Sequence, residues 1–176
     1  MSDTDTALLA RFRRIAITGA PRAGKSTLAR DLDDGRLAVH TDDYRCYVDS
    51  THGREWFATH EAADARLQEL AREGVDAVKP PKPWSEVPYG VLEALEGSES
   101  FIVEGVQVPR TLRKGLEVDV VLYMPQPRHE LSSGQAAMAK GLNTVLLKWR
   151  RDYDNNNTTV LVATPDGWQP MEEVTS

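Results

Sequence analysis

The chain has 176 residues, of which 40% are hydrophobic and 27% charged, and its net charge is −6. This length is enough for a domain with its own core, and we expect a single domain over residues 1–176. The acidic balance argues against a protein that coats nucleic acid, because such proteins are usually basic. No apolar run has the length of a membrane span, and a single cysteine, Cys46, excludes an intramolecular disulfide, so we expect a cytoplasmic protein.

The first predicted elements enclose a phosphate-binding loop. Residues 13–18 predict a short buried strand, and residues 26–33 predict a helix. Between them, Gly19-Ala20-Pro21-Arg22-Ala23-Gly24-Lys25-Ser26-Thr27 fits G-x-x-x-x-G-K-[ST], the P-loop pattern. Its backbone amides would bind phosphate oxygens, Lys25 would contact the β- and γ-phosphates, and the Ser26 hydroxyl would ligate Mg²⁺. The loop therefore predicts binding of ATP with Mg²⁺.

Two adjacent carboxylates follow the next predicted strand, at residues 37–40. The sequence there is Thr41-Asp42-Asp43-Tyr44-Arg45. Ligands of open α/β sheets bind beyond the C-terminal ends of the strands, so Asp42 and Asp43 are candidates for a catalytic base and for Mg²⁺ ligation through water. The alternative is that an Asp side chain only caps a turn. The neighbouring P-loop favours a functional role for at least one of them.

The order strand, P-loop, helix, strand and Asp-Asp-Tyr resembles the uridine kinase, pantothenate kinase and phosphoribulokinase group of P-loop kinases. In that group an Asp after the second strand, followed closely by an aromatic residue, takes the proton from the acceptor hydroxyl. The resemblance implies this role for Asp42, with Asp43 next because the register differs by one residue. Tyr44 and Arg45 are candidates for substrate binding.

The resemblance also implies an acceptor-binding region over about residues 45–90. A helix is predicted at 60–73, and the rest of 48–84 has no regular pattern. Trp56 or Trp84 would stack on a base, with packing in the core or in a loop as the alternative for each.

A second acid and a small cationic patch follow a predicted helix at 88–96. The apolar run 101–105 predicts a buried parallel strand that ends in Glu104, where P-loop proteins carry a Walker B carboxylate. The resemblance implies that Glu104 acts on Mg²⁺ through water or on the acceptor. Beyond it, Arg110 has cationic neighbours and would meet acceptor phosphates or a nucleic-acid backbone; a solvated loop is the alternative.

The C-terminal third predicts a strand at 118–124, a mostly helical segment at 128–153, a last strand at 158–163 and a tail beyond it. The run containing Arg150 and Arg151 is similar to the segment that opens the lid of nucleoside kinases, which implies a short lid at about 148–157. There the arginines would neutralise charge on the transferring phosphoryl group. The alternative is a surface helix end, where cations suit the dipole.

Together these patterns predict an α/β P-loop NTPase fold with a five-stranded parallel sheet and helices on both faces. The expected function is an ATP-dependent kinase that phosphorylates a hydroxyl of a nucleoside-like small molecule. One alternative is a kinase acting on a hydroxymethylpyrimidine base within DNA, because the compact layout resembles phage kinases of that kind. A further alternative is a P-loop nucleotide-binding switch without kinase activity, although the Asn-Lys-x-Asp motif of GTPases is missing.

Overall fold

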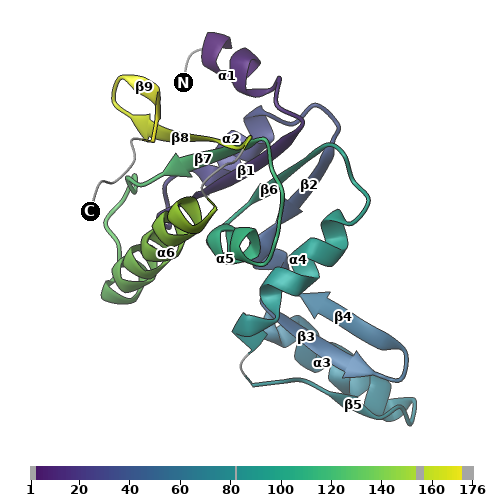
Figure 1. Cartoon of the computed structure of the whole chain (residues 1–176). Helices are drawn as coiled ribbons and strands as arrows, with labels where there is room; N and C mark the ends of the chain where they lie inside the picture. The colour runs from purple at the N-terminus through teal and green to yellow at the C-terminus, as the bar shows by residue number, and fades with distance from the viewer. Residues whose placement is uncertain (1–2, 82, 154–156, 172–176) are drawn as a thin grey trace.

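The computed structural model describes residues 3–81, 83–153 and 157–171, and its centre is a six-stranded sheet (Figure 1). The strands lie in the order β2-β6-β1-β7-β8-β9. They are β1 (Arg14–Gly19), β2 (Leu37–His40), β6 (Phe101–Glu104), β7 (Val120–Met124), β8 (Thr159–Thr164) and β9 (Gly167–Pro170). The first five in this order pair in parallel, and β9 pairs antiparallel with β8.

The expected α/β class is confirmed, but the expected purely parallel sheet of five strands is wrong. The turn at Pro165-Asp166 folds the chain back on itself, so the segment that we expected to be a tail becomes β9. This strand is only four residues long and ends in proline, so its own sequence pattern is too short to predict a strand.

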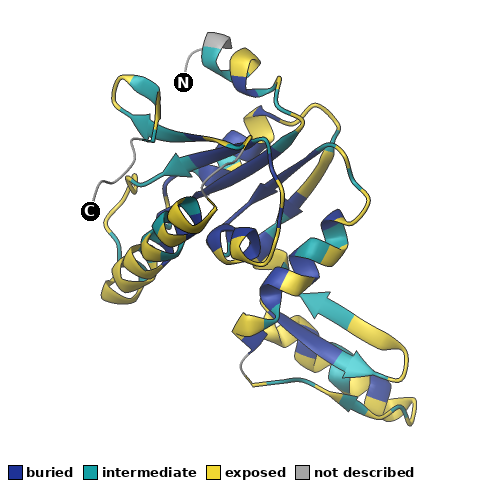
Figure 2. Ribbon diagram, in the orientation of Figure 1, coloured by how far each residue is buried: buried dark blue, intermediate teal, exposed yellow. Residues whose placement is uncertain are grey.

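Helices cover both faces of the sheet. One face packs against α4 (Val87–Leu95), α5 (Val108–Arg113) and α6 (Ser133–Asp152), through a cluster that includes Val91, Leu112 and Leu146. The other face packs against α1 (Asp3–Leu9) and α2 (Lys25–Asp31). Alternate residues of β1 supply both clusters, since Ala16 faces one and its neighbours the other. Figure 2 shows the resulting layer of buried strands between half-exposed helices.

A smaller antiparallel sheet extends from this body (Figure 1). It has the order β4-β3-β5 and packs on α3 (His60–Arg72) around Cys46, Val48 and Leu70. Its strands are β3 (Cys46–Ser50), β4 (Gly53–Phe57) and β5 (Ala77–Val78). The helix was predicted within one residue, whereas the hairpin before it was expected to be irregular. Two short 3₁₀ helices, η1 (Thr41–Tyr44) and η2 (Pro83–Ser85), flank the small sheet in the sequence.

The parallel strands give the main sheet two distinct ends. Four of the strands end at the same end of the sheet, which we call the P-loop end; their last residues are Gly19, His40, Glu104 and Met124. The far end is where these strands begin. None of the helices in the described part of the chain combines the length and the apolar character needed to cross a membrane.

Candidate phosphate-binding site

The segment Gly19–Thr27, which we call the P-loop after its sequence pattern, has the predicted strand–loop–helix setting between β1 and α2. Gly24 adopts φ 95°, and a Cβ there would lie 2.6 Å from Cζ of Arg128. The site therefore needs glycine for its backbone conformation and for the close approach of this guanidinium group. Arg22 is in the left-handed region as well, with φ 58°, so the loop turns tightly between Gly19 and Lys25.

Lys25 is buried at the first position of α2 and folds back over the loop. Its Nζ donates a hydrogen bond to the carbonyl oxygen of Ala20 at 2.7 Å. Burial lowers the pKa of this amine, and the nearby charges of Glu104 and Asp42 raise it in part. A desolvated ammonium group attracts an anion more strongly than an ammonium group in water does.

Glu104 lies next to the P-loop because β6 pairs with β1. It is 6% exposed, and its Oε1 accepts a hydrogen bond from Ser26 Oγ at 3.0 Å. The same oxygen lies 2.7 Å from Nδ1 of His40, which is opposite Glu104 in the β2–β6 register. His40 was not predicted as a site residue. Its position at the end of β2, just before the Asp pair, was the signal available in the sequence.

The two predicted aspartates differ in position. Asp42 lines the same cavity as Lys25, Ser26 and Glu104. Its side chain is 60% exposed and pairs with Arg45, whose Nη2 lies 3.2 Å from Asp42 Oδ2. Asp43, one residue further along η1, is exposed and does not line that cavity. The geometry therefore brings together Asp42 and the P-loop, and leaves Asp43 outside.

These residues enclose a volume of about 640 Å³, which we call the P-loop cavity. The loop contributes Pro21, Arg22 and Gly24 to Thr27 to its lining, and Arg45, His60 and Trp84 line it as well. Half of the Trp84 surface is exposed at this rim. Arg45 and Trp84, both predicted to bind substrate, therefore meet the cavity.

The other two predicted aromatic contacts are packing residues in this structure. The Trp56 ring lies 5.0 Å from that of Tyr47 and 5.6 Å from that of Tyr44, and both Tyr44 and Trp56 pack on the main core. The indole nitrogen of Trp56 is buried without a hydrogen-bond partner among the described residues. Burial also raises the pKa of Tyr44. Neither ring lines the P-loop cavity, so the predicted stacking of Trp56 on substrate is not supported.

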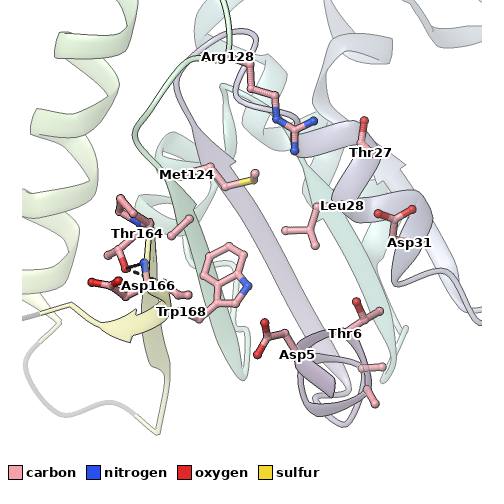
Figure 3. Close-up of a pocket in the computed structure, with 15 residues that line it drawn as sticks. Asp5, Thr6, Thr27, Leu28, Asp31, Met124, Arg128, Thr164, Asp166 and Trp168 are labelled. Carbon is pink, nitrogen blue, oxygen red and sulfur yellow. Dashed lines mark hydrogen bonds between the residues drawn. The ribbon is translucent and has the colours of Figure 1, made fainter. Parts of the chain in front are cut away.

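A second cavity, of about 1100 Å³, adjoins the loop on the side of α1 and β9. Trp168 and Leu28 lie along it, with Arg128 and Thr27 toward one end and Asp5 toward the other (Figure 3). We call it the Trp168 cavity. The backbone amide of Arg128 donates to the carbonyl of Arg22 at 2.9 Å, which holds this segment against the P-loop. Arg128 was missed from the sequence, because nothing around it resembles a site motif.

The predicted lid arginines lie at the far end of the sheet. Gln135 and Met138, near the start of α6, line the P-loop cavity, but α6 has 20 residues and spans about 30 Å. Arg150, at its other end, donates to the carbonyl of Thr158 just before β8 begins, and Arg151 pairs with Asp152. Neither arginine lines a cavity described above. The expected lid continues into 154–156, which lie outside the described residues.

The donors at the P-loop suit Mg²⁺ bound together with a nucleotide. Among the described residues there is no group of three or more His, Cys, Asp or Glu side chains that could hold a metal by themselves. Mg²⁺ at a P-loop does not need such a group, because it takes ligands from phosphates, water and one hydroxyl. Ser26 and the adjacent Glu104 can supply the hydroxyl and a carboxylate that holds a ligating water.

Comparison of the chain with protein-family models, with curated proteins and with solved structures finds no match.

Proposed function

We propose that the protein is a kinase that transfers the γ-phosphoryl group of ATP to a hydroxyl of a nucleoside-like acceptor. The observation that supports this most is the convergence of Lys25, Ser26, Asp42 and Glu104 on one cavity of about 640 Å³. These residues come from three separate segments, the P-loop, η1 and the end of β6. A phosphate-binding loop alone suits any nucleotide-binding protein, whereas an exposed carboxylate that lines the same cavity suits a phosphotransferase.

Each of the two cavities that adjoin the loop would bind one of the two substrates. The donor nucleoside would occupy the Trp168 cavity, which is about 1100 Å³ and offers an aromatic ring for a base. Its triphosphate would then pass Thr27 and Arg128 and lie over the loop. The acceptor would enter the P-loop cavity from the side of Arg45 and Trp84.

Charge stabilisation on the phosphoryl group would come from buried or loop-bound cations. Lys25 exchanges its hydrogen bond to Ala20 for phosphate oxygens. Arg128, which lies against Gly24, takes the role that the sequence assigned to Arg150 or Arg151. Mg²⁺ bound together with the nucleotide would neutralise negative charge on its phosphates. Ser26 and Glu104 orient its ligands, and Glu104 is itself oriented by His40.

Asp42 is the proposed acceptor of the hydroxyl proton. Its side chain is open to the cavity, so a hydroxyl can approach it, and Arg45 restricts its rotation. A carboxylate in hydrogen-bond reach of the hydroxyl directs that oxygen at the γ-phosphorus and receives the proton as the bond forms. Most of the rate would come from this positioning and from the preorganised cations.

The proposal is tested with ATP labelled at the γ-phosphate. The labelled nucleotide is incubated with the protein and with free nucleosides, with duplex DNA that carries hydroxymethyl bases, or with no acceptor. We expect transfer of label to one acceptor class, with little release of inorganic phosphate in its absence. A protein that binds and hydrolyses ATP equally with and without every acceptor would instead be a nucleotide-binding switch, and the kinase proposal would fail.

A further inference from the structure

We propose that the acceptor carries a phosphate group, which binds in a basic groove next to the P-loop cavity. The groove has a volume of about 500 Å³. It is formed by η2, α4, α5 and α6 and lined by Trp84, Ser85, Pro88, Val145 and three cations, Arg110, Arg113 and Lys114. We call it the α5 groove. The inference rests on the proposed function in one respect, because only a kinase would make the ligand an acceptor. The phosphate-binding site itself does not require kinase activity.

The charge of the α5 groove sets it apart from the rest of the molecule. Three cations and no carboxylate line it among the described residues, in a chain whose net charge is −6. By contrast, Asp5, Asp31 and Asp166 line the Trp168 cavity, with Arg128 as its cation. The α5 groove is thus a local site for anions on an acidic protein.

The three cations are available to a ligand. Within the described part of the chain, none of them forms an ion pair with a carboxylate, whereas Arg14, Arg54 and Arg66 each do. Arg110 donates to the side-chain oxygen of Gln107 at 3.3 Å, and Lys114 lies over the Tyr89 ring with its Nζ 5.3 Å from the centroid.

A helix C-terminus favours cations and disfavours anions, because about half a negative charge resides there. Arg110 and Arg113 lie in the last turn of α5 and Lys114 is its C-cap, so that effect explains why cations are common there. Their spacing, i, i+3 and i+4, places all three on one face of the helix, and their full charges exceed the partial charge of the helix end. The net field in the α5 groove favours an anion.

Two residues connect the α5 groove with the P-loop cavity. Trp84 lines both and is half exposed at their junction. Gln107 lines the P-loop cavity and accepts from Arg110, which lines the α5 groove. A molecule whose hydroxyl faces Asp42 can therefore stack a ring on Trp84 and extend a phosphate to the arginines. That arrangement fits a nucleotide, as a free phosphomonoester or within a single-stranded polynucleotide, better than an uncharged nucleoside.

The test is a binding experiment that does not require catalysis. The probes are thymidine, thymidine 5′-monophosphate and a fluorescein-labelled single-stranded oligonucleotide of ten residues. The variant is Arg110→Gln with Arg113→Gln, and the control is Arg11→Gln with Arg72→Gln. All four arginines are exposed, and the control pair lines none of these cavities. Because the P-loop also attracts phosphate, each measurement is repeated after Lys25→Ala has been added to the groove variant and to the control variant.

We expect the groove variant to weaken binding of at least one phosphate-bearing probe by roughly tenfold or more, since each charge-assisted contact is worth about that factor. Thymidine affinity and the control should be unchanged, and the loss should persist with Lys25→Ala. A loss for both phosphate probes identifies a nucleotide as the ligand. If only the oligonucleotide loses affinity, the ligand is a polynucleotide backbone. In that case the slope of the logarithm of its binding constant against the logarithm of the salt concentration should fall in magnitude by about 1.4.

The inference is overturned if groove and control variants bind every probe alike, or if the loss disappears with Lys25→Ala. Failure of the proposed kinase activity gives a different result. In that case the arginine-dependent binding would remain, and the labelled ATP experiment would yield no phosphorylated product.

Discussion

The two ends of the main sheet carry the same kinds of residue but use them differently. At the far end, Arg14 donates to Asp119 from Nη2 at 2.8 Å and from Nε at 3.3 Å, and its backbone amide donates to the same carboxylate. At the P-loop end, neither Lys25 nor Arg128 has an ion pair within 4.0 Å among the residues that the structure describes. The Arg14–Asp119 pair at the far end joins β1 to the residue before β7. At the P-loop end Asp42 pairs with Arg45 and Glu104 with His40, while Lys25 and Arg128 remain available for a ligand.

The strongest test of this contrast is Lys25→Ala. Removing the loop ammonium should lower phosphoryl transfer by roughly 10³, in line with the loss of one main donor to the transition state. The fold should survive, because among the described residues the side chain hydrogen-bonds only to a loop carbonyl, and its burial is itself unfavourable for a charge. Transfer assays and thermal melting measure the two effects. A large drop in melting temperature would mean that Lys25 is a structural residue, and the contrast would fail.

The next test compares the two adjacent aspartates. Asp42→Asn should reduce turnover by roughly 10², the usual contribution of a positioned base, with ATP affinity within about twofold. Asp43→Asn is the matched control, because Asp43 does not line the P-loop cavity and should leave turnover nearly unchanged. Turnover is measured with saturating acceptor, and ATP affinity by calorimetry. Equal effects of the two substitutions would remove Asp42 from the proposed role.

A third test compares arginines from the two ends of the sheet. Arg128→Ala should lower turnover by roughly tenfold or more and weaken ATP binding, because its guanidinium group lies against the loop at Gly24. The double change Arg150→Ala and Arg151→Ala should alter both quantities by less than about twofold. The same transfer and calorimetric assays apply. If the double variant loses activity and Arg128→Ala does not, the lid suggested by the sequence is correct after all.

The smallest expected effect is at the far end and concerns stability alone. Asp119→Asn should cost about 1 kcal/mol, after allowance for the partial exposure of its pair with Arg14, which corresponds to about 2–4 °C in melting temperature. Turnover should not change. The loss should depend on pH, because hydrogen bonding from Arg14 lowers the pKa of Asp119 below its usual value.

The sign of this pH dependence follows from linkage. The stabilisation is complete above the unfolded pKa of about 4, and it is lost as the pH falls through the lowered pKa of the folded state. Melting curves of the two proteins should therefore differ at pH 7 and converge as the solution becomes more acidic. A difference that stays constant down to strongly acidic pH would show that the charge of Asp119 is not its cause.

Local patterns predicted the parts of the site that lie within one stretch of chain. The P-loop is contiguous, and the apolar run before Glu104 indicates a buried strand whose last residue must emerge at its C-terminal end. His40 and Arg128 were missed because their positions depend on contacts between segments far apart in the sequence. The β2–β6 register brings His40 to Glu104, and the hydrogen bond to Arg22 brings Arg128 to the loop.

The separation of Arg150 and Arg151 from the P-loop has a physical origin in helix length. Gly134 and Gly141 lie inside α6 without breaking it, because the helix runs continuously from Ser133 to Asp152. Ser132 and Gln135 form a capping box at its start, with the Ser132 side chain accepting from the Gln135 amide and the Gln135 side chain accepting from the Ser132 amide. That S-x-x-Q pattern was present in the sequence and marks where the helix begins. Counting residues from it would have put the arginines several turns from the phosphates.

One contact fixes how far apart the proposed base and the proposed metal-binding acid can lie. Gly105, which follows Glu104, adopts φ 136°, and a Cβ there would collide with Oγ1 of Thr41, the buried residue that precedes Asp42. The Thr41 side chain fits here only against a residue without a Cβ, so this contact sets how closely the segments that carry Asp42 and Glu104 approach each other. The protein would then select acceptors by their length at this point, and a redesign for longer acceptors would have to begin by separating these two segments.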